Sequence, residues 1–395
     1  MNRLGALIAP PYDVIDQAER ARYAALDPDN IVHVMLPEAP PGAPEDARYH
    51  AAAEQLARWR KGGVLRRDPE PVLYVLAQEF TLPTGERRTR RGVFAAVAAE
   101  GYEPRRVRPH EHTHAGPKAD RLALMRATKA NIESIFLLAP DPDRALANAL
   151  AAVSQGKPDA TAELNGVGIR LWIIRDLSRI PLPPSPLYIA DGHHRYETAS
   201  AYAQENPAAD RLLALIVSAQ DPGLAVLPTH RVIFGPGREI EPLLPRWREW
   251  FDVQRVTDSD PLATLASLGR DRTACLVADR SRVLALLLKP GALPDRLPSL
   301  AQSTAVRDLD VARVESLVVK EILSAGTATP VIRYVADGKS ALDMVGSGGA
   351  AVAVLLNPTK VEQVFAVADA GDVMPPKSTY FIPKVPSGLV LRPLS

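Results

Sequence analysis

Runs of apolar residues along the chain predict a mixture of strands and helices. Apolar segments at 72–80 and 90–98 flank a Pro-Thr-Gly turn, which is typical of a β-hairpin. Helical spacing of apolar residues predicts helices over 44–61 and 118–131. Further strands are expected at 135–138, 169–174, 187–190, 212–217, 225–227, 274–277, 283–288, 331–335 and 350–355, and further helices at 144–153, 196–204, 239–250, 311–324 and 358–368. This order predicts a mixed α/β (α+β) fold, with flanking helices on a mixed sheet.

The length of 395 residues predicts two domains. We expect an α/β domain at 1–235 that carries Glu111 and the Asp191–Arg195 turn, and a smaller α/β domain at 236–395 whose Lys377–Lys384 tail returns to that site. Lys and Arg number 47 against 46 Asp and Glu, so charge gives no case for binding nucleic acid or membranes. No apolar stretch approaches the roughly 20 residues of a membrane span, and the start has no apolar signal core. We therefore expect a cytoplasmic protein. The one cysteine, Cys275, is expected to be a small buried residue.

The densest cluster of reactive side chains is Asp191-Gly192-His193-His194-Arg195, which follows a short apolar strand and precedes a helix. Glycine permits an unusual turn there, and the N–H groups at the start of a helix favour an anion, most often phosphate. Arg195 offers a fork for phosphate, and His193 and His194 can donate to an anion or move a proton. Asp191 suits metal binding or general base catalysis. The alternative is that Asp191 caps the helix and Arg195 pairs with an acid.

A second cluster, His110-Glu111-His112-Thr113-His114, matches the bare H-E-x-x-H zinc pattern. That pattern requires a helix, and the nearby Pro109 and Pro117 leave little room for one. In an extended chain, the three histidines would share one face. The interpretations left open are a catalytic acid or base at Glu111, a metal site of some kind, and a histidine-rich surface loop.

Four further segments carry side chains of the kinds that bind an anion or line a binding site. Each segment also has a purely structural explanation. Basic residues in the first turn of a helix oppose its dipole unless an anion lies near. Prolines around lysines and hydroxyls fix a backbone that can clamp a phosphate. The candidates are Lys118 and Arg121 at the start of a helix, His230 and Arg231 after a strand, Lys377, Ser378, Thr379 and Lys384 near the C-terminus, and Tyr12 and Asp13 after two N-terminal prolines.

Taken together, five blocks resemble the prokaryotic family catalogued as "domain of unknown function 1015". In order, the blocks are Ala9–Ile15, His110–Thr113 with Lys118 and Asp120-Arg121, Ile189–Tyr196, Pro228–Arg231 and Met374–Lys384. They span nearly the whole chain. His112 and His114 are not signature positions of that pattern, which weakens the case for a metal. The lead-in before the first block is shorter than in the family, so we expect the chain to start late and to lack an edge strand.

The turn at 191–195 is also similar to the phosphate-binding motif of the free serine kinases, which belong to the ParB and sulfiredoxin superfamily. This resemblance implies a ParB/sulfiredoxin-like phosphate-binding core. It implies that Asp191, His193, His194 and Arg195 hold phosphates or Mg²⁺, with Asp191 as the metal ligand, and that Glu111 is the base. The implied cofactors are ATP or ADP and Mg²⁺, with His110 and Thr113 beside the substrate.

We therefore expect a nucleotide-dependent kinase of a small hydroxyl metabolite, with free L-serine as the first candidate substrate. Phosphoryl transfer needs positive charge at the phosphates, a metal and an aligned nucleophile, which these blocks supply if they converge. One alternative is a nucleotide-binding regulatory protein of the ParB type. Another is a metal-dependent phosphoester hydrolase that uses His110, Glu111, Asp191 and His193. The expected partners are a nucleotide and a small-molecule substrate, without nucleic acid or membrane.

Overall fold

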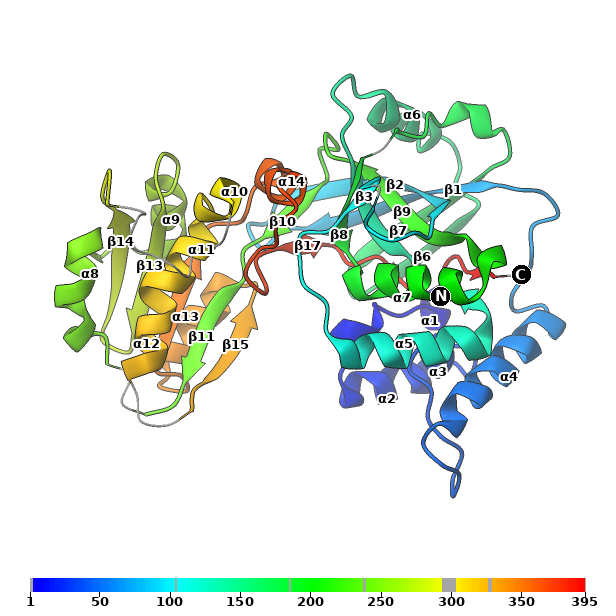
Figure 1. Cartoon of the computed structure of the whole chain (residues 1–395), viewed down its shortest axis with the longest axis horizontal. Helices are drawn as coiled ribbons and strands as arrows, with labels where there is room; N and C mark the ends of the chain where they lie inside the picture. Colours follow the sequence, from blue (N-terminus) through cyan, green and yellow to red (C-terminus); the bar gives the residue numbers. More distant parts are fainter. Residues whose placement is uncertain are drawn as a thin grey trace. The chain divides into compact units, whose positions relative to one another are not determined.

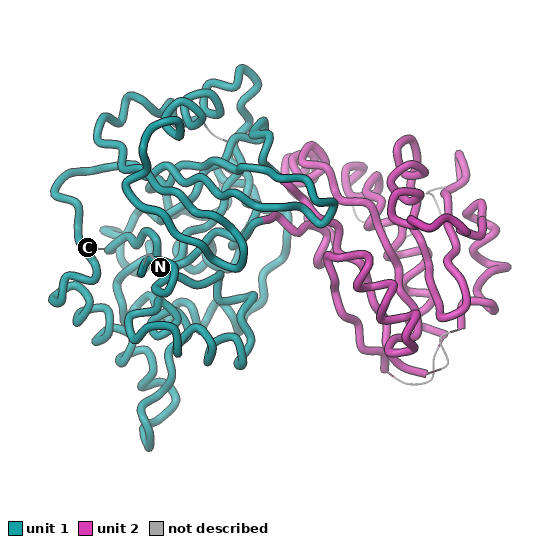
Figure 2. Tube along the Cα trace, turned by 180° about the vertical axis from the view of Figure 1, so that it is seen from behind, with its two compact units in different colours: residues 1–224, 383–395 teal, residues 225–382 magenta. Residues whose placement is uncertain are grey.

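The computed structural model describes residues 3–103, 105–184, 186–236, 239–292, 303–325 and 329–394. The chain forms two compact units: residues 1–224 with 383–395 make unit 1, and residues 225–382 make unit 2 (Figure 2). This division differs from the expected border at 235. Unit 1 ends at Leu224, and the chain returns to it at Pro383.

Among the described residues of unit 1, eight strands form one mixed sheet in the order β3-β8-β5-β9-β2-β1-β7-β6 (Figure 1). Neighbours are antiparallel except for the parallel pairs β3–β8 and β5–β9. The strands are β1 (Leu73–Thr81), β2 (Arg87–Ala98), β3 (Val107–Arg108), β5 (Ile135–Ala139), β6 (Ala160–Leu164), β7 (Val167–Ile174), β8 (Leu187–Asp191) and β9 (Arg211–Ser218). The continuous apolar run of β5 is buried at every position, as a central strand requires.

Helices flank this sheet, which confirms the predicted mixed α/β architecture. The main core of unit 1 lies between the sheet and α6 (Ala145–Val153) and α7 (His193–Glu205). A second core joins the helices of the N-terminal region to α5. These helices are α1 (Leu4–Leu7), η1 (Tyr12–Val14), α2 (Gln17–Leu26), α3 (Val32–Met35), α4 (Ala47–Lys61) and α5 (Ala115–Thr128), with η2 (Leu177–Arg179) and η3 (Pro207–Ala209) elsewhere in the unit. A short pair, β4 (Ala130–Asn131) with β18 (Arg392–Pro393), ties the C-terminal segment into unit 1.

Within the described part of unit 2, six strands form an antiparallel sheet in the order β12-β14-β13-β16-β11-β15, and β10 pairs with β17. The strands are β10 (Ala225–Leu227), β11 (His230–Phe234), β12 (Phe251–Val256), β13 (Ala274–Asp279), β14 (Arg282–Leu288), β15 (Val331–Val335), β16 (Val352–Leu356) and β17 (Tyr380–Ile382). The helical segments are η4 (Glu241–Leu243), α8 (Leu244–Trp250), α9 (Pro261–Leu268), α10 (Thr304–Arg307), α11 (Asp310–Val314), the π-helical η5 (Glu315–Val319), α12 (Lys320–Ala325), α13 (Gly338–Gly346) and α14 (Val361–Asp369). Cys275 is buried in β13, as predicted. A search of the described residues finds no helix with the length and apolar character that crossing a membrane requires.

The β1–β2 hairpin matches the prediction, and the arginines of β2 differ widely in their exposure. Arg90 is only 1% exposed. Its guanidinium donates to the Gln78 side chain and lies 4.5 Å from the centre of the Phe136 ring. Burial lowers the pKa of Arg90 to about 9. Neighbouring strand residues face opposite sides of a sheet, so Arg90 and the half-buried Arg91 meet different surroundings.

Gly223, near the end of the 1–224 segment of unit 1, packs closely against the backbone of β2. A Cβ atom at this position would lie 2.1 Å from the Thr89 carbonyl oxygen, which belongs to the backbone and cannot easily move. We expect Gly223→Ala to lower the free energy of unfolding by about 1–3 kcal/mol in urea titrations followed by circular dichroism. Gly116→Ala is the control, because its methyl group would meet no neighbouring atom in α5. Unchanged stability of Gly223→Ala would contradict this packing.

Candidate functional site

The turn between β8 and α7 has the strand–glycine–helix form that the sequence predicted. Asp191 ends β8, and α7 begins at His193. Gly192 lies between them with φ +95°, in the left-handed region that favours glycine. A Cβ atom on Gly192 would lie 3.1 Å from the Cζ atom of Arg195. The glycine therefore allows the guanidinium of Arg195 to fold back over the turn.

Asp191 lies between two cations. Its Oδ2 atom is 2.5 Å from Nη2 of Arg195, and its Oδ1 atom is 2.5 Å from Nζ of Lys384. Burial raises the pKa of Asp191, but Lys384 and Arg195 outweigh it and hold the pKa well below its usual range. Lys384 comes from the C-terminal segment of unit 1. The predicted block that contains Arg195 and the predicted block that contains Lys384 therefore meet at the carboxylate of Asp191.

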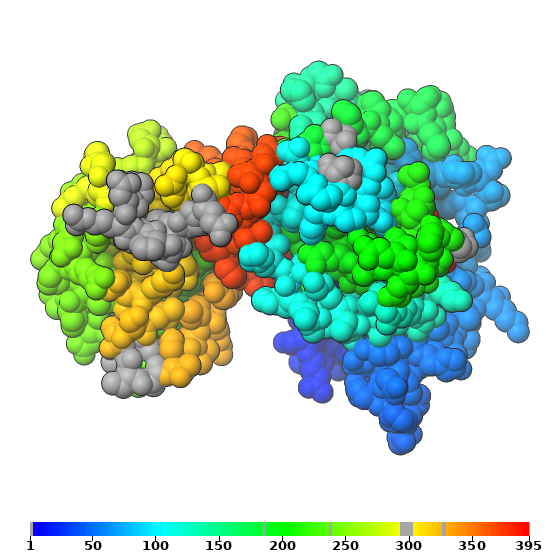
Figure 3. All heavy atoms as spheres, viewed as in Figure 1, coloured from blue at the N-terminus to red at the C-terminus, as the bar shows by residue number. Residues whose placement is uncertain are grey.

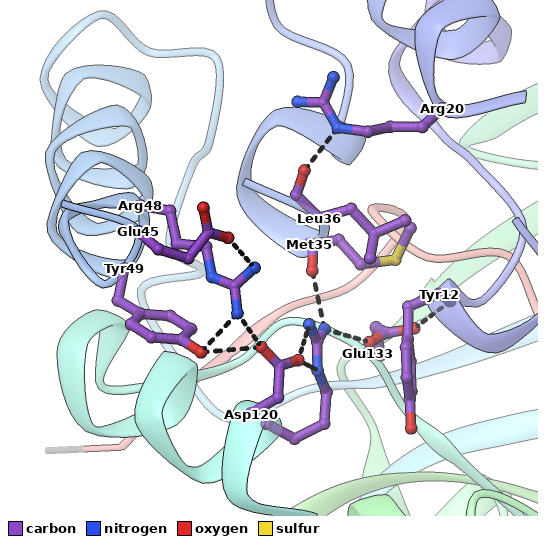
Figure 4. A network of polar contacts seen from close by, with 10 residues as sticks. Tyr12, Arg20, Met35, Leu36, Glu45, Arg48, Tyr49, Asp120 and Glu133 are labelled. Atoms are coloured by element: carbon purple, nitrogen blue, oxygen red, sulfur yellow. Dashed lines mark hydrogen bonds and ion pairs between the residues drawn. The ribbon is translucent and has the colours of Figure 1, made fainter. Parts of the chain in front are cut away.

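A second buried carboxylate, Glu133, lies close enough to Arg195 and Arg121 to feel their charges. Arg195 donates through Nη1 to the carbonyl of Ser134. One oxygen of Glu133 accepts from the backbone N–H of Tyr12 at 3.0 Å, and the other is 3.7 Å from Nη1 of Arg121 (Figure 4). Burial raises the pKa of Glu133, and the nearby arginines oppose that rise. Glu133 was not among the predicted site residues, although its charge just before the apolar β5 was a usable signal.

Arg121 is held in place by neighbours on several elements. Its guanidinium donates to Asp120 and, at 2.7 Å, to the carbonyl of Met35, and it lies 4.3 Å from the centre of the Tyr12 ring. Asp120 also accepts from the Tyr49 hydroxyl at 2.8 Å and from Arg48 at 3.0 Å (Figure 4). Arg121 therefore links α5 to α3, α4 and the N-terminal block that includes Tyr12. Asp13 follows in η1, where its side chain is exposed.

The two histidines of the turn accept hydrogen bonds from the backbone of the 110–114 loop. The N–H of His110 donates to Nε2 of His193 at 3.2 Å, and the N–H of His114 donates to Nε2 of His194 at 2.9 Å. An imidazole that accepts at Nε2 is neutral and carries its proton on Nδ1. Burial lowers the pKa of both imidazoles, which favours this neutral form. The sequence-based prediction, that these side chains donate to an anion or move a proton, did not include this role as acceptors.

Glu197 is a third acceptor on α7 for the same loop. Its Oε2 atom accepts from the Thr113 hydroxyl and from Nζ of Lys118, both at 2.7 Å. Its Oε1 atom accepts from the Tyr102 hydroxyl at 3.2 Å. Burial raises the pKa of Glu197, but these donors bring it below its usual value. The sequence signal was its position three residues after His194, which places both side chains on one helix face.

The loop that these acceptors hold brings Glu111 to His193. The carboxylate of Glu111 lies 3.8 Å from Nδ1 of His193, and its side chain is 32% exposed. The segment 110–114 is a loop and not a helix. His110 is buried whereas His112 and His114 are exposed, so the expectation that the three histidines share one face was wrong.

A metal site built by protein side chains alone does not fit this arrangement. Across the described ranges, no group of three His, Cys, Asp or Glu side chains gathers closely enough to hold a metal ion. Both oxygens of Asp191, the predicted Mg²⁺ ligand, are engaged in ion pairs. We therefore derive no chemical step through a metal.

Five predicted site residues belong to unit 2, where they make local contacts. Nδ1 of His230 accepts from the N–H of Leu356 at 3.2 Å, and Nε of Arg231 is 3.2 Å from Glu315. Burial lowers the pKa of His230 to about 4. These two side chains are thus engaged within unit 2.

The remaining three form a turn of unit 2 that two threonines hold. Lys377 has φ +56°, which strains a residue other than glycine. Its carbonyl accepts from the Thr229 hydroxyl, and the carbonyl of Ser378 accepts from the Thr359 hydroxyl at 2.8 Å. Thr379 follows, just before β17. The predicted block at 228–231 and the part of the 374–384 block that belongs to unit 2 are therefore in contact with each other.

The chain matches one protein family and is similar to several solved structures. Residues 1–312 match the family model described as protein of unknown function (DUF1015). No curated protein matches the chain. Similar solved structures include a free serine kinase mutant in complex with AMP (13% identity, 74% of this chain, 87% of that chain, TM-score 0.39) and SbnI with C-terminal truncation from Staphylococcus aureus (12%, 76%, 87%, 0.40). Another is a conserved hypothetical protein from Pyrococcus furiosus (15%, 74%, 93%, 0.36). TM-scores this low support no functional conclusion.

Acid should weaken the docking of the 110–114 loop on α7. Because burial lowers the pKa of His193 from 6.5, the unfolded chain takes up a proton at a higher pH than the folded protein. The stability that the neutral imidazole contributes is complete above about pH 6.5 and is lost as pH falls toward the folded pKa. We expect a lower urea midpoint at about pH 5 than at about pH 7.5.

The matched variants for this test are His193→Gln and His112→Gln. A glutamine oxygen at 193 can accept from the N–H of His110 without titrating, so the difference between the two pH values should shrink. His112 is exposed and makes neither loop contact, so its variant should keep the full difference. An unchanged difference in His193→Gln would contradict this role.

Proposed function

The chain belongs to the DUF1015 family, and we propose that within it this protein is a nucleotide-dependent kinase that phosphorylates a hydroxyl group of a small metabolite. The observation that carries the proposal is the ion triad of Asp191, Arg195 and Lys384 at the start of α7. Two cations on one carboxylate leave net positive charge beside a helix N-terminus, which attracts a polyanion. The similarity of the 191–195 motif to the phosphate-binding motif of free serine kinases supports the same function.

In this proposal, Lys384 and Arg195 bind the phosphates of ATP or ADP together with the first N–H groups of α7. The triad is assembled before the ligand arrives, because Asp191 orients both cations. Phosphoryl transfer requires mainly positioning and charge stabilisation from the protein. Cations that need not reorganise are well suited to stabilising the charge that develops on the transferred group.

Glu111 is the proposed general base. The substrate hydroxyl would give its proton to the carboxylate of Glu111 while its oxygen forms a bond to the terminal phosphorus of the nucleotide. The bond from that phosphorus to the bridging oxygen breaks, and the shortened nucleotide leaves with the electron pair. His193 and His194 act as positioning residues, because they hold the backbone on either side of Glu111.

Lys384→Ala tests the phosphate contact. We expect isothermal titration calorimetry to show ATP or ADP binding by the wild-type protein and an affinity about 10- to 100-fold weaker in the variant, since a charge-assisted hydrogen bond is worth about 1.5–3 kcal/mol. Lys339→Ala is the matched control, because Lys339 likewise pairs with an aspartate, Asp343, at 3.0 Å, but in unit 2. A wild-type protein that binds neither nucleotide would refute the proposed function.

Glu111→Gln separates a kinase from a nucleotide-binding regulatory protein. With Mg²⁺, ATP or ADP and a panel of hydroxy acids and amino acids, we expect the variant to lose at least about 100-fold in turnover, measured as phosphorylated product by mass spectrometry. Its nucleotide affinity should stay unchanged, because the carboxamide keeps the shape of the side chain. The exposed Glu249 supplies the control variant Glu249→Gln. Nucleotide binding without turnover in the wild type would favour the regulatory protein.

A further inference from the structure

A cavity of about 460 Å³ lies in unit 1 between α5, α7 and the turn that follows β2. Its volume falls within the range of small-molecule sites. Figures 1 and 3 show α5 and α7 side by side on one face of the unit, in teal and green. The lining residues that matter here are Tyr102, Lys118, Leu122, Glu197, Ser200 and Gln204.

The charges around this cavity are already compensated. Lys118 pairs with Glu197 at 2.7 Å, and Glu100 pairs with Arg106. A polyanion placed here would gain one lysine and face two carboxylates. The cavity therefore favours a ligand part that carries no net charge, in contrast to the triad at Asp191.

An aromatic ring forms one wall of the cavity. Tyr102 stacks on Tyr196 with ring centres 5.4 Å apart and planes inclined by 15°. The Tyr102 hydroxyl is tied to Glu197, and its carbonyl accepts from the N–H of Arg105 at 2.6 Å. Arg105 has φ +67°, a strained conformation of the kind that gathers at ligand clamps. The ring is thus held firmly as a platform for a flat ligand.

Polar groups for the edge of such a ligand come from α7. Ser200 and Gln204 are four residues apart, so they lie on one helix face and offer a hydroxyl and an amide to the cavity. A nucleobase presents a flat face and an edge of donors and acceptors, and ribose presents hydroxyls that a carboxylate such as Glu197 accepts. A neutral heterocycle with attached hydroxyls matches this lining.

We propose that this cavity binds the nucleoside part of the nucleotide, with its base on Tyr102. The proposal rests on the proposed nucleotide-dependent function. Glu197 lies four residues, or about 6 Å of helix rise, beyond His193, so the cavity begins about one helical turn from the start of α7. Lys118 stands at this end of the cavity, close to the loop that carries Glu111.

The test compares two ligands that differ in the nucleoside. Calorimetry with ADP and with inorganic pyrophosphate is performed on the wild type, Tyr102→Leu and Lys384→Ala. Because one base–aromatic stack is worth a factor of about 5 to 150, Tyr102→Leu should weaken ADP binding by that factor and leave pyrophosphate binding unchanged. Lys384→Ala should weaken both ligands.

Two further variants separate stacking from other effects. Tyr102→Phe keeps the ring and loses the hydroxyl that reaches Glu197, so its ADP affinity should stay within a few-fold of the wild type. Tyr74→Leu is the matched control, since Tyr74 is also half-buried and its hydroxyl also bonds a carboxylate, that of Asp68. Circular dichroism of each variant confirms that it is folded.

Each outcome distinguishes the two proposals. If the wild type binds ADP and Tyr102→Leu binds it equally well, the nucleoside does not occupy this cavity, and the kinase proposal survives. If pyrophosphate binds as tightly as ADP, no nucleoside pocket contributes and this inference is overturned. If neither ligand binds the wild type, the proposed function fails and this inference fails with it.

Discussion

The candidate site depends on one buried carboxylate that is held between two cations. Withdrawing Asp191 from water is costly, and the cost is offset only while Arg195 and Lys384 both remain in contact. This requirement couples the start of α7 to a segment nearly two hundred residues later in the chain. The side-chain amide of Gln78 donates to the backbone carbonyl of Lys384 at 2.9 Å, so β1 also fixes the lysine. The C-terminal segment is therefore part of the site's construction.

The start of helix α7 requires one side chain to be charged and two others to be neutral. Arg195 must be charged, and Asp191 together with Glu133 raises its pKa against the effect of burial. His193 and His194 must be neutral to accept from the loop, and burial lowers the pKa of each. Neutral imidazoles beside a guanidinium also avoid repulsion between like charges. One helix start can thus hold cations for a ligand and acceptors for a loop.

The sequence predicted the Asp191–Arg195 turn because a strand, a glycine and a helix leave local signals. It could not predict the partners of His193 and His194, since backbone N–H groups carry no residue signature. Arg90 and Glu133 were missed because their burial depends on neighbours far along the chain. The division at Leu224 likewise depends on distant contacts, because the C-terminal segment of unit 1 pairs with β4.

The distribution of charge along α7 gives the strongest link between the site and its neighbouring cavity. At the start of the helix, the triad itself carries two positive charges and one negative charge. One turn later, Lys118 and Glu197 neutralise each other. A ligand with a charged end and a neutral end would match both regions without breaking either set of ion pairs. A ligand charged at both ends would compete with the pairing of Lys118 and Glu197, whose Oε2 atom also accepts from Thr113 of the Glu111 loop.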